Sequence, residues 1–386
     1  MSPGSPPAPL TDRRALERAC ARLARAPYLA VDTEFHRERT FFAQLCLVQI
    51  ASSDEAVLVD PLAVRDLTPL KELLMLPGIV KVLHAAGQDL EIFHDLWSAV
   101  PAPLFDTQVA AGVLGLGHQV GYARMVEQLL DVKLEKAGTL TDWARRPLAD
   151  DQLRYAVDDV VHLAAAYPVL LARLQDQGRS DWLAPEMKAL SDPQQFAADP
   201  EAAWRTVRGA GSARGPVRLV VRALATWREE QARTRNIPRR WVLPDESLVE
   251  VARMRPAARE EMARVRGLSA RFLDDHGDRL LKVIAEASKD PAESPASRVR
   301  RLSPEAESLA DLMHCLVRMR ARERGVAATQ LATREQLERV ADEGVDAEAA
   351  VLEDWRREVV GDDLLALRAG MLRLVVQDGK VVIERG

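Results

Sequence analysis

The chain has 386 residues, which is long for one domain, so we expect two or three. Its composition, 47% hydrophobic and 29% charged, is that of a soluble protein, and no run approaches the roughly 18 apolar residues that a membrane helix needs. The net charge of −5 argues against a uniformly basic nucleic-acid-binding protein, but ten arginines between residues 205 and 240 form a basic segment that could contact phosphates.

Cysteine usage and the N-terminal residues indicate the compartment. Cys20, Cys46 and Cys315 are far apart and match neither a disulfide framework nor a zinc pattern, which indicates a reducing environment. The first ten residues are rich in proline, with neither a basic start nor an apolar stretch, so we expect no secretory signal. We therefore expect a cytoplasmic protein with no membrane partner, and we favour a monomer.

Short apolar segments near the start of the chain predict a sheet. After an amphipathic helix over residues 11–26, strands are expected at 28–35, 45–51, 56–60, 79–84 and 104–106. The helices expected between and after them are 68–75, 88–97, 107–115, 121–130 and 150–175. Strands first and then alternating strands and helices predict an α/β domain over residues 1–180, with a mixed sheet flanked by helices.

The rest of the chain is predicted to be helical. We expect a basic linker at 181–214, a helical domain at 215–286, a Ser-, Pro-, Ala- and Glu-rich linker at 287–303 and a second helical domain at 304–386. Residues 232–252 align without gaps to residues 321–341, which predicts two copies of one small helical module. The chain ends in a predicted hairpin around Asp378-Gly379.

Two acidic residues, Asp32 and Glu34, stand in an otherwise apolar predicted strand. Alternate strand residues share a face, so the two carboxylates carry a desolvation cost that a Lys or Arg partner or a hard metal ion must offset. Asp89 stands where a turn enters a helix, and Tyr155 and Asp159 are four residues apart on one helix face. Singly, each has a structural explanation: a solvent-facing strand end, a helix cap or a common helical pair.

Together, four carboxylates and one phenol predict a metal site. Such a donor set suits two Mg²⁺ or Mn²⁺ ions about 3.5–4 Å apart, of which one activates water and the other stabilises a departing 3′ oxygen. A phenol has an unperturbed pKa of about 10, so Tyr155 is better suited to orient the water than to deprotonate it. Asp158 adjoins Asp159, and only the four-residue spacing from Tyr155 selects Asp159.

The acidic motifs resemble those of ribonuclease D, a group of DEDD-type 3′–5′ exonucleases, in the branch with Tyr in its third motif. The matching segments are VDTEF (31–35), HAAGQDL (84–90), LFDTQ (104–108), TDWARRPL (141–148) and RYAVDDV (154–160). In the sister branch a His lies five residues before the last Asp, and that position is Arg154 here. The resemblance implies a ribonuclease H-like fold for residues 1–180.

The resemblance also implies roles for single residues. It makes Asp32, Glu34, Asp89 and Asp159 the metal ligands and gives Tyr155 the positioning of the water. Just before the third motif, Trp143, Arg145 and Arg146 are candidates for stacking on a base and contacting phosphate in a single strand. The alternative, a core Trp with solvated arginines, is equally consistent with the sequence.

The helical modules resemble HRDC domains, small bundles that commonly bind nucleic acid. Residues 215–286 match through several short motifs, whereas residues 304–375 match through the internal repeat alone. The candidate nucleic-acid-binding residues of the first copy are Arg235, Arg239, Arg240 and Trp241. The alternative is ordinary surface arginines around a core Trp. The second copy has Ala328, Thr329 and Gln330 at the last three of these positions, so we expect it to be architectural.

The sequence thus predicts a metal-dependent 3′–5′ exoribonuclease that acts on RNA with a single-stranded 3′ end and releases nucleoside 5′-monophosphates. The resemblance implies trimming of 3′ extensions from tRNA and other stable RNA precursors. Two alternatives stay open. One is a 3′–5′ DNA exonuclease, because the carboxylates do not sense the 2′-hydroxyl. The other is a catalytically silent RNA-binding scaffold, which the intact acidic motifs disfavour.

Overall fold

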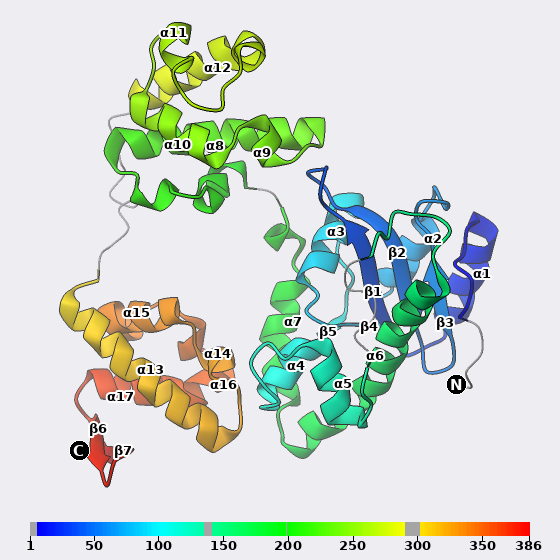
Figure 1. Cartoon of the computed structure of the whole chain (residues 1–386). Coiled ribbons are helices and arrows are strands. Elements are labelled where there is room, and N and C mark those ends of the chain that lie inside the picture. Colours follow the sequence, from blue (N-terminus) through cyan, green and yellow to red (C-terminus); the bar gives the residue numbers. More distant parts are fainter. Residues whose placement is uncertain (1–5, 135–140, 198, 290–301) are drawn as a thin grey trace. The chain divides into compact units, whose positions relative to one another are not determined.

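The computed structural model describes residues 6–134, 141–197, 199–289 and 302–386 (Figure 1). The chain divides into two compact units. The first contains residues 1–34, 45–195 and 301–386, and the second contains residues 35–44 and 196–300. The loop at 35–44 therefore belongs with the helical second unit, although it connects two strands of the first.

The first unit is built on a five-stranded sheet with the order β3-β2-β1-β4-β5. Its strands are β1 (Tyr28–His36), β2 (Gln44–Ala51), β3 (Ala56–Val59), β4 (Val80–Leu83) and β5 (Leu104–Asp106). β1 and β5 each pair in parallel with β4, whereas β2 and β3 are antiparallel. The sheet is mixed, which confirms the fold class that the sequence predicts.

Helices flank this sheet (Figure 1). They are α1 (Arg13–Leu23), α2 (Thr68–Leu74), α3 (Gly87–Trp97), α4 (Thr107–Val113), α5 (Tyr122–Leu130), α6 (Asp150–Asp176) and α7 (Ala184–Leu190). Val160 and Leu163 of α6 share an apolar core with Ala30 of β1 and Val82 of β4. This packing decides which face of β1 meets α6.

Within the described residues, α6 is the one helix whose length and composition would allow it to cross a membrane. Its buried side chains, among them Leu163 and Leu170, instead pack in the core of the first unit. An apolar helix that covers a sheet has the same composition as a membrane span, so α6 is accounted for by its packing.

The segment predicted as a basic linker, residues 181–214, is folded in its described parts, 181–197 and 199–214. Its start forms α7, and Leu183 just before α7 is buried in the core around α6. Its second half contains a 3₁₀ helix, η3 (Pro200–Thr206), and Val207 is buried in the core of the second unit. The prediction that this segment is a linker was therefore wrong. The apolar residues of this segment are small and scattered among Pro and Gly. They lack the helical periodicity from which burial could be predicted.

A second helical module packs within the first unit. It consists of α13 (Pro304–Arg324), α14 (Ala328–Leu331), α15 (Arg334–Glu343), α16 (Asp354–Arg356), α17 (Asp362–Arg368) and the hairpin β6 (Leu372–Gln377) and β7 (Lys380–Arg385). The Trp355 indole donates to the carbonyl of Trp182 at 3.0 Å, and the two rings stack with centroids 4.2 Å apart. Arg356 forms an ion pair with Glu186 of α7. Aromatic stacking and a partly buried ion pair thus fix the module to the region around α7.

The second unit is a helical bundle. Its helices are α8 (Gly215–Arg235), α9 (Arg239–Val242), α10 (Asp245–Met254), α11 (Arg259–Met262) and α12 (Ala270–Lys289). Leu224 and Trp227 of α8 pack in one core with Leu280 of α12. Phe41, from the loop at 35–44, enters the same core and is only 6% exposed. That aromatic side chain explains why the loop belongs to this unit.

Candidate active site

Three acidic side chains of the first unit meet at the interface of β1 and α6. Ala30 faces α6, so Asp32 and Glu34, two and four residues further along β1, face it too. Asp159 lies on α6, one residue before the buried Val160. One carboxylate oxygen from each of these three acids lies within 4.8 Å of the others. The structure therefore gathers three of the four predicted ligands at one point.

The fourth predicted ligand, Asp89, lies beside this cluster. It stands in the first turn of α3 and is buried, and the hydroxyl of Thr33 donates a hydrogen bond to its carboxylate. Thr33 is the residue between Asp32 and Glu34, so one β1 segment both carries two acids and holds a third. The negative charge of Asp89 also raises the pKa of Asp32 and of Glu34. Asp89 thus belongs electrostatically to the site.

Burial and mutual repulsion make ionisation of this group of acids costly. Burial, followed by repulsion from neighbouring acids, raises the pKa of Asp32 well above its usual range and that of Glu34 to about 8. Burial is also the main cause that raises the pKa of Asp159 to about 7 and of Asp89 to about 6. No Lys or Arg among the described residues forms an ion pair with any of the four acids. Concentrated, uncompensated carboxylate oxygens are the donor set that hard divalent cations take.

Tyr155 stands one helical turn before Asp159 and is half-buried. Its phenol acts to lower the pKa of the Asp159 carboxyl, against the larger effect of burial. Burial and then the charge of Asp159 raise the pKa of the Tyr155 phenol. The phenol therefore stays protonated at neutral pH and can donate and accept hydrogen bonds, but it cannot act as a base. The neighbouring Asp158 is exposed and outside the cluster, so the fold selects Asp159.

Two regions of the chain match described protein families. Residues 7–175 match the family described as 3′–5′ exonuclease, and residues 218–284 match the HRDC domain. Ribonuclease D of Sphingobium indicum is 42% identical to the chain over 382 residues, which cover 97% of this chain and 98% of that protein. The chain belongs to the ribonuclease D family.

Other relatives extend this likeness to structure. Ribonuclease D of Zymomonas mobilis is also 42% identical, over 97% of each protein. The crystal structure of Escherichia coli RNase D, described as an exoribonuclease involved in structured RNA processing, matches with a TM-score of 0.81 at 29% identity, over 94% of this chain and 98% of that one. The RRP6 catalytic core of Trypanosoma brucei matches with a TM-score of 0.56 at 25% identity, over 72% and 80%. As a ribonuclease D, the chain is a 3′–5′ exoribonuclease.

The segment before the third motif of this ribonuclease D is mostly structural. Trp143 is buried in a small core and its ring lies beside that of Tyr155, with centroids 6.1 Å apart. Arg146 binds Asp60 through two nitrogens, at 2.6 and 2.8 Å, and donates to the carbonyl of Cys46. The sequence made both side chains candidates for RNA binding, but in the structure neither is free to bind RNA. Arg145 is exposed and stays a candidate.

The candidate nucleic-acid-binding residues of the HRDC domain also fall into two groups, one engaged within the protein and one exposed. Arg239 binds the buried Glu229 through two nitrogens, at 2.5 and 2.7 Å, and its guanidinium lies 4.5 Å from the centroid of the Phe41 ring. That side chain holds the bundle and the loop together. Arg235, Arg240 and Trp241 are exposed and stay candidates for RNA contact.

Sequence reasoning missed two residues of the active site. Thr33 donates a hydrogen bond to Asp89, and its position between two acids of the first motif could have indicated this role. Tyr122, at the start of α5, donates through its hydroxyl to the main-chain carbonyl of Asp159. No local pattern marks Tyr122, because its contact depends on how α5 packs against α6. Asp106, at the end of β5, caps α4 by accepting hydrogen bonds from the main-chain nitrogens of Gln108 and Val109.

Proposed function

We propose that this enzyme removes nucleotides one at a time from the single-stranded 3′ ends of tRNA and other stable RNA precursors, releasing nucleoside 5′-monophosphates, with two Mg²⁺ or Mn²⁺ ions as cofactors. The observation that carries the proposal is the convergence of three partly buried acids within 4.8 Å, with Asp89 beside them and no cationic side chain paired with any of the four among the described residues. The substrate class is supported by the similarity to E. coli RNase D, whose role is given as structured RNA processing.

The roles of the chain's own residues follow from their positions. Asp32, Glu34 and Asp159 would hold the metal ions, and Asp89 would complete the set from beside Asp32. Two divalent ions bound there supply a hydroxide nucleophile at neutral pH and stabilise the leaving 3′ oxygen. Tyr155, protonated and one helical turn before Asp159, would orient the attacking water towards the terminal phosphodiester.

The test is a time course of hydrolysis of an RNA that carries a 5′ label and an unpaired 3′ tail. With Mg²⁺ or Mn²⁺ we expect a ladder that shortens by single nucleotides from the 3′ end, with nucleoside 5′-monophosphates as the released product, and no shortening in EDTA. A tRNA precursor with a 3′ extension should be shortened to the end of its tail. A DNA of matched sequence should be degraded more slowly.

Adjacent acids on α6 provide a matched pair of variants. Asp159→Asn should lower kcat by at least about a hundredfold, because it removes a ligand that the reaction needs. Asp158→Asn makes the same chemical change one residue away, on an exposed side chain, and should leave the rate unchanged. Hydrolysis that persists in EDTA, internal cuts, or equal rates for the two variants would each contradict the proposal.

A further inference from the structure

Asp106 and Thr107, at the centre of the segment LFDTQ (104–108), have no role in the proposed function. Both side chains are buried, 3% and 0% exposed, where β5 ends and α4 begins. We propose that Asp106 is a positioning residue, whose carboxylate holds the turn between β4 and α3 so that Asp89 lies beside the other three acids. The role of Asp89 as a metal ligand rests on the proposed function, whereas the hold on the turn does not.

The turn between β4 and α3 has an unfavourable backbone conformation. Ala85 has a φ of +56°, in the left-handed region that residues with a Cβ rarely adopt. Such a conformation persists only where surrounding contacts impose it. The next residue, Ala86, precedes α3 and has no side-chain oxygen with which to cap the helix. The turn therefore needs a partner from another part of the chain.

The carboxylate of Asp106 is that partner. Its Oδ2 accepts a hydrogen bond from the main-chain nitrogen of Ala86 at 2.9 Å, and its Oδ1 accepts one from that of Ala85 at 3.2 Å. Oδ1 also accepts from the main-chain nitrogens of Gln108 and Val109, at 2.8 and 3.3 Å, which caps α4. One oxygen suffices for a helix cap, since Ser and Asn serve about as well as Asp at such positions. The second oxygen of Asp106 thus acts on the turn.

Asp106 is itself held in place. It pairs with Leu83, the last residue of β4, in the parallel ladder between β4 and β5, and its main-chain nitrogen donates to Sδ of Met187 at 3.2 Å. The hydroxyl of the adjacent Thr107 donates to the carbonyl of Leu83 at 3.0 Å and lies 2.9 Å from Nδ1 of His84. Because the single hydroxyl hydrogen goes to Leu83, the imidazole is the donor in the second contact. Asp106 and Thr107 together therefore contact each residue from 83 to 86.

Movement of the turn would be passed on to Asp89. This residue stands three positions after Ala86, in the first turn of α3, so a shift at the start of the helix displaces its carboxylate. The hydroxyl of Thr33 holds that carboxylate from β1. Asp89 is thus fixed through its side chain by one strand and through its backbone by Asp106. Divalent cations take carboxylate oxygens at defined distances, so a looser Asp89 should bind them less tightly.

Two substitutions separate the cap of α4 from the hold on the turn. In Asp106→Asn the amide oxygen can keep the bonds of Oδ1, but the NH₂ group then replaces Oδ2 and meets the main-chain N–H of Ala86, a donor facing a donor. Asp106→Ser caps a helix about as well as Asp does, and it has neither a second oxygen nor an opposing donor. Both variants should therefore keep α4 and lose the hold on the turn.

Hydrogen exchange of the metal-free full chain tests the hold directly. In both variants the main-chain amides of residues 84–90 should exchange about tenfold faster, because their hydrogen bonds to the carboxylate are lost. Those of residues 107–113, in α4, should keep their protection. This measurement involves no metal, RNA or activity, so it does not depend on the proposed function.

Titration calorimetry with Mn²⁺ tests the consequence for Asp89. Without RNA, both variants should bind Mn²⁺ with a Kd about tenfold or more above that of the wild type. In hydrolysis of a 3′-tailed RNA, the Mn²⁺ concentration for half the maximal rate should rise by a similar factor, and saturating Mn²⁺ should restore most of the rate. A general loss of folded protein would instead lower the number of ions bound per chain.

Both substitutions also remove a negative charge near Asp89, which could itself weaken cation binding. Ala85→Gly distinguishes the two causes, because glycine adopts a positive φ without strain and so favours the native turn. Added to Asp106→Asn, it should restore part of the affinity for Mn²⁺ if the turn is responsible. It cannot replace a lost charge.

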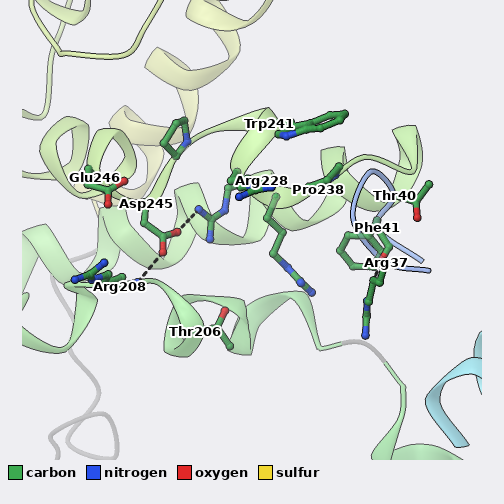
Figure 2. A pocket seen from close by; sticks show the side chains of 13 residues that line it. Arg37, Thr40, Phe41, Thr206, Arg208, Arg228, Pro238, Trp241, Asp245 and Glu246 are labelled. Atoms are coloured by element: carbon green, nitrogen blue, oxygen red, sulfur yellow. Dashed lines mark hydrogen bonds and ion pairs between the residues drawn. The ribbon is translucent and has the colours of Figure 1, made fainter. Parts of the chain in front are cut away.

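Asp245 offers a matched control in the second unit. It opens α10, pairs with Arg228 at 2.6 Å and accepts from the main-chain nitrogen of Arg208 at 3.0 Å, as Figure 2 shows. It thus also joins the start of a helix to a distant segment, but the second unit contains none of the four acids. Asp245→Asn should lower the melting temperature and leave the Kd for Mn²⁺ unchanged.

The outcomes separate this inference from the proposed function. If residues 84–90 exchange in both Asp106 variants as in the wild type, the carboxylate does not hold the turn and the inference fails. If the turn loosens but Mn²⁺ binds as tightly as before, if Ala85→Gly restores nothing, or if Asp245→Asn weakens Mn²⁺ binding equally, Asp106 does not position Asp89. If the wild-type chain binds no Mn²⁺, the proposed function fails, whereas hydrogen exchange still decides whether Asp106 holds the turn.

Discussion

The phenol of Tyr122 on α5 donates a hydrogen bond to the main-chain carbonyl of Asp159 on α6. A second contact, 3.3 Å long, joins the same hydroxyl to the carbonyl of Asp158. Tyr122 thus holds the turn of α6 that carries the catalytic carboxylate. Further along the same helix, Tyr28 donates to the carbonyl of Ala164 at 3.1 Å. One helix is therefore anchored by two phenols, of which one acts at the active site.

We predict that Tyr122→Phe lowers kcat about tenfold with little change in KM. The ring keeps its packing against His84, but the turn carrying Asp159 loses its anchor, and small displacements of a reacting group are costly. Steady-state kinetics on a 3′-tailed RNA will measure the effect. Tyr28→Phe removes an equivalent hydrogen bond to the same helix, from a residue of β1, so each variant should lower the free energy of unfolding by about 1 kcal/mol, but Tyr28→Phe should leave kcat unchanged. Equal kinetic effects of the two variants would refute a positioning role for Tyr122.

The hydroxyl of Thr33 supports Asp89, and we expect it to matter for metal affinity. Thr33→Val keeps the shape of the side chain but removes the donor that fixes the Asp89 carboxylate. The concentration of Mg²⁺ that gives half the maximal rate should rise about tenfold or more, as it does when supporting hydrogen bonds around a metal site are lost. Thr33→Ser retains the hydroxyl and should titrate like the wild type. If Thr33→Val needs no more metal, Asp89 does not depend on this bond.

The ion pair between Arg146 and Asp60 should contribute to stability. Arg146 also donates to the carbonyls of Trp143 and Cys46, at 2.7 and 2.6 Å, so it connects the segment before α6 to the sheet. Asp60→Asn should lower the free energy of unfolding by about 2 kcal/mol at pH 7, because a charge-assisted bond to a buried carboxylate is lost. Urea denaturation will measure this. Glu17→Gln, in the solvent-exposed pair with Arg13, should leave it essentially unchanged.

The same pair predicts a dependence on pH. Burial alone would raise the pKa of Asp60, but the hydrogen bond and charge of Arg146 outweigh it, and the pKa is lowered. A carboxyl whose pKa is lower in the folded state contributes stability above its unfolded pKa of about 4, and this is lost as pH falls through the folded value. The difference in unfolding free energy between the wild type and Asp60→Asn should therefore shrink below about pH 4. A constant difference down to pH 2 would exclude this linkage.

Close backbone contact holds the second helical module against α4. A Cβ at Gly115, whose φ is +72°, would lie 2.4 Å from the carbonyl oxygen of Gly325, and Ala327 donates to the carbonyl of Gly112 at 2.9 Å. Gly115→Ala should therefore loosen this contact, and hydrogen exchange of the main-chain amides around α4 should become faster. Gly78→Ala, where a Cβ would meet nothing within 4 Å, is the control. Unchanged exchange in Gly115→Ala would show that the contact does not constrain α4.

Much of the fold follows from local patterns. The alternation in β1, the turn residues before α3 and the period of α6 are short-range features, and each predicted strand of the sheet was found within a few residues of its expected limits. The hairpin at Asp378-Gly379 has the positive φ values that such a turn requires. The segment at 181–214 was predicted incorrectly because its burial depends on surfaces that distant parts of the chain provide.

The sequence by itself determined the chemistry of the site, because residue type and spacing specify which carboxylates share a strand face or a helix face. Only the tertiary structure decided which aromatic and basic side chains are free for RNA. Trp143 and Trp241 are both tryptophans beside arginines, yet one is 6% exposed and the other 55%. The physical reason is that burial and side-chain pairing depend on partners far away in the chain, such as Asp60 for Arg146 and Phe41 for Arg239.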